Sequence, residues 1–531
     1  MVLPIDKTGF TLGSRVMGQI LSTETTSIGW WRGSLFKTLF APVDAASTVV
    51  FRISFGLVIA WLGVDYIVVG RAYALYVKPD FHFTYYGFDW VEPFSLSGMK
   101  LFFLTMSLLG ACVAVGLLYR ITAPFLAVLF TYFLLLDRTN YQNHYYLLTL
   151  LAWMMALIPA HRLWSIDAVL WPSIRSDTVP CWVLWLLRFH VGLPYFFGGV
   201  AKINSDWFAG APLRQMLASR SDAPVIGPWL TLETVVQGFI WGGLLFDLFI
   251  VPLLMWKRTR ILAYLLCLAF HLVNSVVFDS IHVFPWFMIL GTTIFFSPEW
   301  PRRFIGLARV PSNELTQVDP SLPVSGWKSA AMTVLAIYCG FQLLWPFAHL
   351  LEEGDTSWTE RGHHFSWRMM LRGKTSGFRF YVTDPETGKT WNPDVRKWIT
   401  PDQEIRFVRD PEMILHLAHF IADDYLKLTG RRFEVRALVM TSLNGRKPQL
   451  LIDPLVDLAK EPRGYHRRPW IRPLTEPLRK DPWLIPPSEW ERSVEVPRLT
   501  FLKESDASAS NIEIHEGGKS AMPAVNALQR R

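Results

Sequence analysis

The chain has 531 residues, of which 51% are hydrophobic and only 18% are charged. A soluble protein usually carries about a quarter charged residues, so the composition excludes an ordinary soluble protein. Twenty-four tryptophans and 37 phenylalanines indicate a membrane protein, because aromatic side chains gather at membrane interfaces. The formal net charge of +8 is explained by basic loops, since the sequence contains no nucleic-acid-binding motif.

Residues 1–44 are predicted to form an N-terminal segment in the cytoplasm. Residues 1–40 contain no uninterrupted apolar core of the kind that a cleaved signal peptide needs. We therefore expect the first membrane span to act as its own insertion signal.

Apolar stretches between residues 45 and 350 predict about nine transmembrane helices. Several are shorter than the ~20 residues of a straight span, so we expect kinked or partly re-entrant helices. The predicted helices cover residues 45–68, 98–118, 122–136, 145–160, 183–201, 235–256, 261–278, 283–296 and 329–350.

The basic residues predict how these helices are oriented. A cytoplasmic N-terminus places most loop lysines and arginines inside, including the tight basic turn "WKRTR" at 256–260. The same orientation puts residues 135–146, residues 201–207 and everything after residue 350 on the opposite side of the membrane.

Residues 351–500 are predicted to form an extramembrane α+β domain, followed by a disordered tail at 501–531. The segment "SGFRFYVTDPETGKTW" is typical of strand, turn and strand. A helix is expected to begin at Pro411, capped by Asp410, and to end before Gly430. Asn444-Gly445 then indicates a hairpin. The predicted fold is thus a multi-pass α-helical membrane protein with a C-terminal α+β extramembrane domain.

Lys202 lies at the end of the apolar run that precedes "AKINSDW". A lysine at a helix end can be an interface anchor, with its stem in lipid and its ammonium in water. It can also be a base, if its surroundings favour the neutral amine. The spacing of residues alone leaves both interpretations open.

Other polar residues interrupt the predicted helices. His144 lies at the head of one helix, and His271 and Asn274 share a face of another because they are three residues apart. Such residues either hydrogen-bond neighbouring helices or line a polar pocket with Lys202. Arg52 is interpreted as a structural residue of the first helix. His416 and His419 on the predicted soluble helix are interpreted as ordinary surface histidines, so no metal site is predicted.

Several segments resemble, in the same order, those of the vitamin K-dependent γ-glutamyl carboxylase family, including its HTTM-like membrane domain. The resemblance runs from about residue 38 to about residue 474. The segments are "LLDRTNYQNHYYLLTLLAWMMALIPAHRLWSID", "YFFGGVAKINSDWFAG", "FHLVNSVVF", "FFSPEWPRR", "FSWRMML" and "LLIDPLVDLAK".

The resemblance implies an enzyme, a carbon–carbon lyase that carboxylates protein-bound glutamate to γ-carboxyglutamate. The reaction uses reduced vitamin K (the hydroquinone), dioxygen and carbon dioxide, needs no metal, and couples carboxylation to quinone epoxidation. Lys202 matches the family's catalytic lysine, and we expect a desolvated, neutral amine there to deprotonate the hydroquinone. His144 is the second residue to which the resemblance assigns a catalytic role.

Further positions carry over individually. Asn143, beside His144, matches a residue that orients cofactor oxygens, and His271 and Asn274 match the quinone pocket. The cofactor-binding residues implied by "SWRMM" are Trp367, Met369 and Met370. Ser219-Arg220 matches a serine–arginine pair with a spacing that differs by two residues, which implies that Arg220 binds substrate.

The sequence also departs from the family pattern. Ala201 stands where vertebrate members have a first lysine, and the further β-rich region of the animal enzymes does not follow. These differences favour a bacterial inner-membrane protein over one of the endoplasmic reticulum, and they leave recognition of a substrate propeptide open. The expected partners are a glutamate-containing protein and the lipid bilayer. The alternatives are a quinone or lipid epoxidase or monooxygenase without carboxylation, and a non-enzymatic membrane binding protein.

Overall fold

The structure, a computed structural model, describes residues 38–223, 226–278, 282–311, 326–502 and 515–516. The predictions for residues 1–37 and for most of the tail lie outside these described residues. Within the tail, His515–Glu516 form a short strand, β7.

Each of the nine predicted apolar stretches is helical. Among the described residues, six helices are long and apolar enough to cross a membrane, namely α2, α4, α8, α11, α12 and the helical stretch that begins with α16. The protein is therefore an integral membrane protein, and the predicted number of about nine transmembrane helices is not confirmed by the described residues. The bounds are α2 (Ala46–Val68), α4 (Leu96–Val115), α5 (Tyr119–Leu135), α6 (Asn143–Leu157), α8 (Cys181–Ala201), α11 (Glu233–Met255), α12 (Arg260–Val277), α13 (Phe284–Gly291) with η5 (Thr292–Phe295), and α16 (Gly326–Leu344) with η6 (Trp345–Leu351).

Short elements connect these helices. They are β1 (Pro42–Asp44), which pairs with β2 (Thr178–Pro180), α3 (Arg71–Tyr76), η1 (Arg138–Asn140), α7 (Ile166–Leu170), η2 (Pro172–Ile174), α9 (Ser205–Phe208), α10 (Ala211–Ala218), η3 (Gly227–Trp229) and α14 (Trp300–Phe304).

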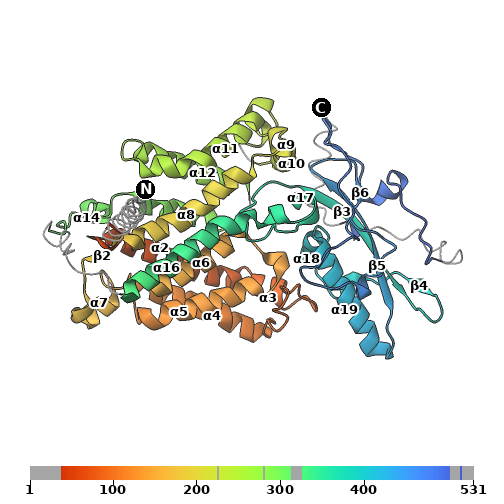
Figure 1. Ribbon diagram of the computed structural model, residues 1–531, viewed down its shortest axis with the longest axis horizontal. Helices are drawn as coiled ribbons and strands as arrows, with labels where there is room; N and C mark the ends of the chain where they lie inside the picture. Colours follow the sequence, from red (N-terminus) through yellow and green to blue (C-terminus); the bar gives the residue numbers. More distant parts are fainter. Residues whose placement is uncertain (1–37, 224–225, 279–281, 312–325, 503–514, 517–531) are drawn as a thin grey trace, which may run out of the picture.

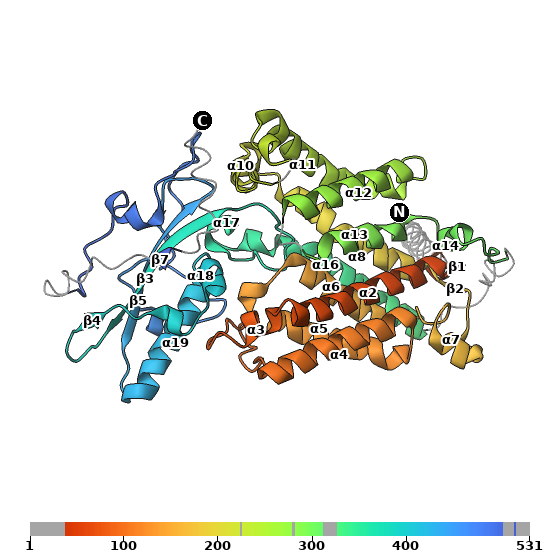
Figure 2. The same cartoon turned by 180° about the vertical axis from the view of Figure 1, so that it is seen from behind.

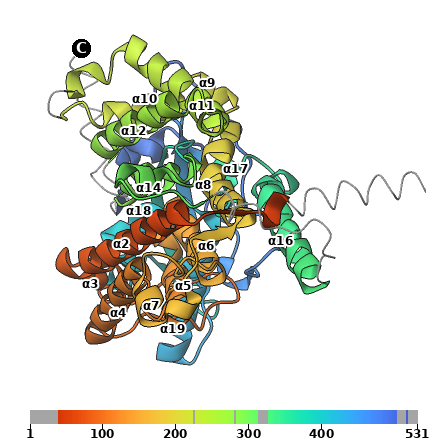
Figure 3. The same ribbon diagram turned by 90° about the vertical axis from the view of Figure 1, so that its left-hand side faces the viewer.

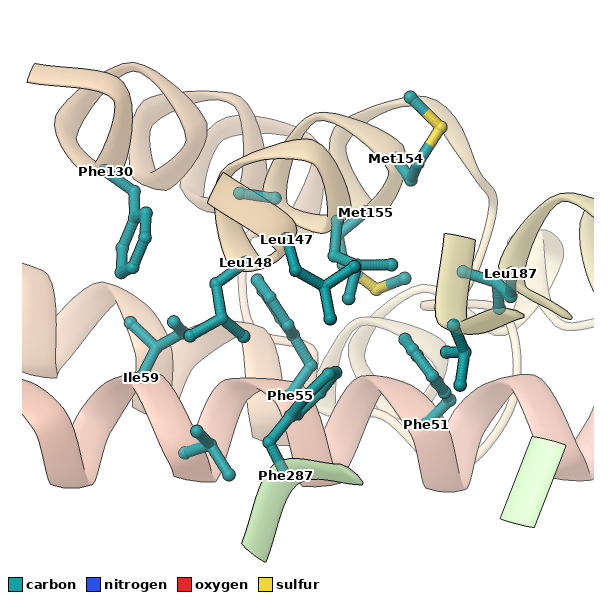
Figure 4. Close-up of a cluster of buried hydrophobic side chains, with 14 of the residues drawn as sticks. Phe51, Phe55, Ile59, Phe130, Leu147, Leu148, Met154, Met155, Leu187 and Phe287 are labelled. Carbon is teal, nitrogen blue, oxygen red and sulfur yellow. The ribbon is translucent and has the colours of Figure 1, made fainter. Parts of the chain in front are cut away.

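The core of the membrane region lies between α2, α5, α6, α8 and α13 (Figure 4). Phe55 and Ile59 of α2 face Leu147 and Leu148 of α6, and Phe287 of α13 packs against Phe55. α2 and α4 lie against each other at Gly56, where an added Cβ would stand 2.5 Å from the carbonyl oxygen of Gly110. Small residues of this kind allow two membrane helices to approach closely.

Arg52 is fully buried in this region. Its guanidinium donates to the carbonyl of Ala160 at 2.6 Å and to that of Trp164 at 2.7 Å. The side chain therefore ties α2 to the loop after α6, in agreement with the structural role expected for it.

The extramembrane domain is built on an antiparallel sheet in the order β4-β3-β5-β6, with α18 and α19 beside it (Figure 1). The predicted strand–turn–strand and the predicted helix are confirmed: Asp410 caps α19, and Gly430 ends it with φ of 73°. The bounds are α17 (Thr356–Thr359), β3 (Lys374–Thr383), β4 (Thr390–Trp391), η7 (Val395–Lys397), α18 (Pro401–Phe407), α19 (Pro411–Thr429), β5 (Glu434–Leu443), β6 (Gln449–Leu450), η8 (Leu458–Lys460) and η9 (Pro487–Arg492).

The hairpin predicted at Asn444-Gly445 also forms, because β5 and β6 are antiparallel and both turn residues have positive φ. His416 and His419 do not lie on a free surface. His416 packs against Phe81 at a ring distance of 4.9 Å, and His419 Nε2 lies 2.8 Å from the carbonyl oxygen of Glu461.

The extramembrane domain covers one end of the helices, and the first described residues lie at the other end, near α14 (Figures 1 and 2). Seen from that other end, α16 lies at the edge of the bundle (Figure 3), and Gln342 is its one buried side chain. Two ion pairs join the domain to the membrane region. Arg138 pairs with Asp410 at 2.9 Å, and Arg446 pairs with Asp206 at 2.6 Å. Asp206 lies four residues after Lys202, so the domain is anchored beside the predicted site.

Candidate active site

Lys202 is buried at the C-terminus of α8, where only 6% of it is exposed. Its Nζ donates to Asp247 Oδ2 at 2.5 Å and to the carbonyl of Gly198 at 3.1 Å. The ring of Trp207 lies 5.2 Å from the same nitrogen. Lys202 is therefore not an interface anchor with its ammonium in water.

Asp247 is the residue that sequence reasoning missed. It lies in the middle of α11 and is 5% exposed. Gly199 lets the two helices meet here, because an added Cβ would lie 2.8 Å from the side chain of Leu248. The structure thus places a carboxylate within hydrogen-bond distance of the Lys202 nitrogen. The desolvated, neutral amine expected for Lys202 stays a prediction, and the structure adds a buried aspartate as its partner. A lone acid in an apolar span was the available signal.

Lys202 faces a cavity of about 470 Å³ between the membrane helices and the extramembrane domain. The structure brings seven predicted site residues to its wall: Asn143, His144, Lys202, His271, Asn274, Met369 and Met370. Two others do not line it. Trp367 is buried against Tyr146, with ring centroids 5.0 Å apart, and Arg220 donates to the carbonyl of Val276 at 3.4 Å.

His144 and His271 lie on either side of Phe284. The ring centroid of Phe284 is 5.6 Å from that of His144 and 5.9 Å from that of His271. His271 Nε2 lies 2.7 Å from the hydroxyl of Tyr195. Among the described residues, His144 Nε2 and His271 Nδ1 are buried without a hydrogen-bond partner. Buried polar atoms are normally satisfied, so two unsatisfied imidazole nitrogens at one cavity indicate ligand-binding atoms.

Asn143 is oriented by Tyr141, which sequence reasoning also missed. The Tyr141 hydroxyl donates to Asn143 Oδ1 at 3.1 Å and accepts from the backbone N–H of Phe365 at 2.8 Å. Because its oxygen is already engaged, Asn143 has its amide N–H₂ group left to donate.

The segment that follows α17 also contributes to the lining of the cavity. Its backbone is unusual, since Glu360, Phe365, Trp367 and Met370 all have positive φ between 58° and 63°. Such conformations are rare for residues other than glycine and collect at functional sites, where the surrounding structure holds them. They carry Met369 and Met370 to the cavity.

The extramembrane wall of the cavity is rich in arginine. The arginines are Arg138, Arg368, Arg372, Arg406 and Arg409. Arg138 pairs with Asp410 and Arg372 pairs with Glu360. Among the described residues, the other three have no carboxylate partner within ion-pair distance.

The three arginines without an acidic partner differ in what they contact. Arg406 donates to Asn140 Oδ1 at 2.6 Å, and Arg368 lies 3.2 Å from His349 Nε2. No described group accepts a hydrogen bond from the guanidinium of Arg409, and burial lowers the pKa of that side chain to about 10. Desolvated cations without counter-charge favour an anionic ligand.

The two walls therefore differ in character. On the membrane side, aromatic and aliphatic side chains surround a few polar atoms, those of the Lys202–Asp247 pair and the two imidazoles. On the extramembrane side, three uncompensated guanidiniums face the same space. This arrangement suits one ligand that enters from lipid and a second that carries a carboxylate.

Comparison with known families agrees with this division. Residues 40–300 match the model of the HTTM domain, and residues 327–477 match the model described as the lumenal domain of vitamin K-dependent gamma-carboxylase. No solved structure matches the chain. The two matches follow each other along the chain, and both contribute residues to the lining of the cavity. The chain belongs to the vitamin K-dependent γ-carboxylase family.

Proposed function

We propose that the protein carboxylates glutamate side chains of a polypeptide acceptor, using reduced vitamin K, dioxygen and carbon dioxide. The observation that carries this proposal is the buried Lys202–Asp247 pair, which faces a cavity with an apolar wall and a cationic wall. Vitamin K hydroquinone supplies, on oxidation by dioxygen, the strong base that removes a γ-proton and the epoxide that forms with the product.

The membrane wall fits a quinone ring. Phe284, together with Met369 and Met370 from the segment after α17, offers apolar, polarisable contacts. The two partnerless imidazole nitrogens and the amide N–H₂ of Asn143 offer hydrogen bonds to ring oxygens. Because the pocket lies among membrane helices, a prenylated ligand reaches it from the bilayer.

The chain's own role at this wall is to take a proton from a bound hydroxyl. An ammonium paired with a carboxylate has no free electron pair, so Lys202 acts as a relay. As its nitrogen receives the hydroxyl proton, it passes one of its own to Asp247 Oδ2 over 2.5 Å. Lys202 remains an ammonium, Asp247 becomes a carboxylic acid, and the pair has gained one proton.

The cationic wall suits the acceptor's carboxylate. A glutamate side chain brings one negative charge, and its carboxylated product brings two. Arg368, Arg406 and Arg409 can neutralise these charges without breaking an existing ion pair. We also propose that this end of the helices faces away from the cytoplasm, as the basic loops predict.

The test is to incubate the purified, full-length protein with reduced vitamin K, labelled bicarbonate and a glutamate-containing peptide. We expect carboxylated glutamate and quinone epoxide to form together. Both products should fall at least a hundredfold in Lys202→Ala, while Lys257→Ala in the basic turn should retain wild-type rates.

Other outcomes would overturn the proposal in distinguishable ways. Epoxide without carboxylated peptide would indicate a quinone epoxidase or monooxygenase on the same scaffold. If no quinone were consumed and the Lys202→Ala variant behaved as wild type in every assay, a non-enzymatic binding protein would be favoured.

A further inference from the structure

One edge of the long strand β3 is only partly paired. Its other edge pairs with β5 along all ten residues, from Lys374 to Thr383. On the partly paired edge, the described residues supply β4 opposite Val382–Thr383 and β7 opposite Gly377–Phe378. An exposed strand edge is a place where an extended peptide can add to a sheet.

The chain's own tail already uses this edge. β7, His515–Glu516, is antiparallel to β3, with Glu516 opposite Gly377 and His515 opposite Phe378. Near the β4 end of β3, Phe501 packs on Tyr381 with ring centroids 5.3 Å apart, and its carbonyl accepts a hydrogen bond from Thr390 Oγ1. A backbone segment of this chain therefore demonstrates the pairing and its direction.

That direction leads to the cavity. Because β7 and β3 are antiparallel, a bound strand with the direction of β7 would lead towards Lys374, and Arg372 of the cavity wall lies two residues before Lys374. In Figure 2, β3 leads from the region of α17, next to the membrane helices, outwards to β4. Five residues separate Gly377 from Arg372, and at ~3.4 Å per residue this is a path of roughly 17 Å.

We propose that the β3 edge binds the acceptor polypeptide as an extended strand, with the glutamate to be modified roughly five or more residues downstream. The proposal rests on the proposed function in that the acceptor is a polypeptide. Charge supports this occupant, since an acceptor with several glutamates is acidic and the cavity wall beyond Arg372 is cationic. β7 occupies the edge in the absence of an acceptor, and an acceptor strand displaces it.

The test uses two variants of the full-length protein. His515→Pro/Glu516→Pro removes both backbone N–H groups of β7, one of which must face β3, because successive residues of a strand point their amides to opposite edges. His515→Ala/Glu516→Ala keeps both N–H groups and is the matched control. The probe is a fluorescein-labelled synthetic peptide copying residues 509–518, and binding is measured by anisotropy without quinone.

We expect the proline variant to bind the probe at least about tenfold more tightly than the alanine variant, because its own strand no longer competes. Two further probes carry N-methyl groups on alternate amides. Methyl groups on the amides that face β3 should abolish binding of the probe, because these amides can no longer donate hydrogen bonds. Methyl groups on the other amides should leave binding unchanged.

Equal affinity of the proline and alanine variants, or equal binding of the two methylated probes, would overturn the proposal. Unchanged thermal unfolding of both variants excludes a general folding defect. Because binding is measured without turnover, a failure of the carboxylation assay would leave this result intact. Conversely, the protein could carboxylate glutamate peptides and yet bind the two methylated probes equally. That result would support the proposed function and exclude the β3 edge as the binding site.

Discussion

Each half of the molecule contains a buried lysine paired with a carboxylate, and the two lysines differ in their hydrogen bonds. Lys374 of β3 donates to Glu360 Oε1 at 2.7 Å and to the carbonyls of Trp358 and Arg409 at 2.6 and 2.8 Å. An ammonium has three N–H groups, so all of them have acceptors. Lys202 donates to two acceptors, Asp247 and Gly198, among the described residues.

The difference separates a lysine with a structural role from the lysine that we propose to be reactive. Lys374 does not line the cavity and has no hydrogen left for a ligand. Glu360 beside it carries a second partner in Arg372, and although burial opposes its charge, Arg372 and Lys374 hold the pKa of Glu360 well below its usual range. Lys202 lines the cavity with one N–H group uncommitted. Burial and pairing are common to both lysines, so the proposed role of Lys202 rests on its incomplete hydrogen bonding at a cavity.

The largest effect that tests this contrast is on stability. Lys374→Met should lower the free energy of unfolding by about 3–5 kcal/mol, because it leaves Glu360 buried with one cation fewer. Denaturant unfolding in detergent, followed by tryptophan fluorescence, measures it. Lys374→Met/Glu360→Leu should recover much of the loss. A stability change below about 1 kcal/mol in the single variant would contradict the structural role of this lysine.

The second prediction concerns pH and the extramembrane wall. Burial, with Arg138 nearby, lowers the pKa of His364 to about 4, against about 6.5 in an unfolded chain. The unfolded chain thus binds the proton more readily. The neutral His364 side chain therefore contributes to the free energy of unfolding. This contribution is fully present above pH 6.5 and is lost as the pH falls towards 4, by up to about 3 kcal/mol.

Melting temperatures of the purified protein between pH 7.5 and 4 measure this loss. His364→Phe keeps a ring against Tyr141, which lies 4.6 Å away, but cannot titrate. Its melting temperature should therefore depend less steeply on pH than that of the wild type. Parallel curves for the two proteins would show that His364 does not titrate as expected.

Asp247→Asn tests the proton relay. The amide keeps the shape of the side chain and still accepts a hydrogen bond from Lys202, but it cannot hold the transferred proton. We expect turnover to fall about a hundredfold with little change in the affinity for the quinone. Quinone epoxide formation under saturating peptide measures turnover, and Asp247→Glu should restore part of it. Wild-type turnover in the asparagine variant would mean that the proton leaves by another route.

Arg409→Gln tests the cationic wall. Because Arg409 has no acidic partner among the described residues, its loss should not leave a buried carboxylate unpaired. We expect the KM for a glutamate peptide to rise about tenfold with kcat nearly unchanged, since a charge-assisted hydrogen bond is worth about 1.5–3 kcal/mol. Arg432→Gln, outside the cavity wall, is the matched control. Equal KM values for the two variants would remove Arg409 from acceptor binding.

Arg409 also shows where sequence reasoning stops. Helices follow from local hydropathy, and the cap residues Asp410 and Gly430 act on their own neighbours, so these features were predictable. Lys202 and His271 were recognisable as polar residues in apolar surroundings. The missing counter-charge of Arg409 and the partner of Lys202 depend on contacts between distant segments. Asp247 satisfied the same criterion as His271 and was detectable, whereas its contact with Lys202 was not.

The smallest effect is expected at Tyr141, which lines the cavity and orients Asn143 through a hydrogen bond. Tyr141→Phe keeps the ring but loses the hydrogen bonds to Asn143 and to the N–H of Phe365. Asn143 can then rotate its amide, and the N–H of Phe365 loses its acceptor. We expect kcat to fall about fivefold, with a smaller change in the KM for the glutamate peptide, because the cationic wall is untouched. The decisive comparison is Asn143→Ala alone and combined with Tyr141→Phe. If Tyr141 acts through Asn143, adding the tyrosine change to Asn143→Ala should lower kcat no further, whereas multiplied effects would mean that Tyr141 acts independently.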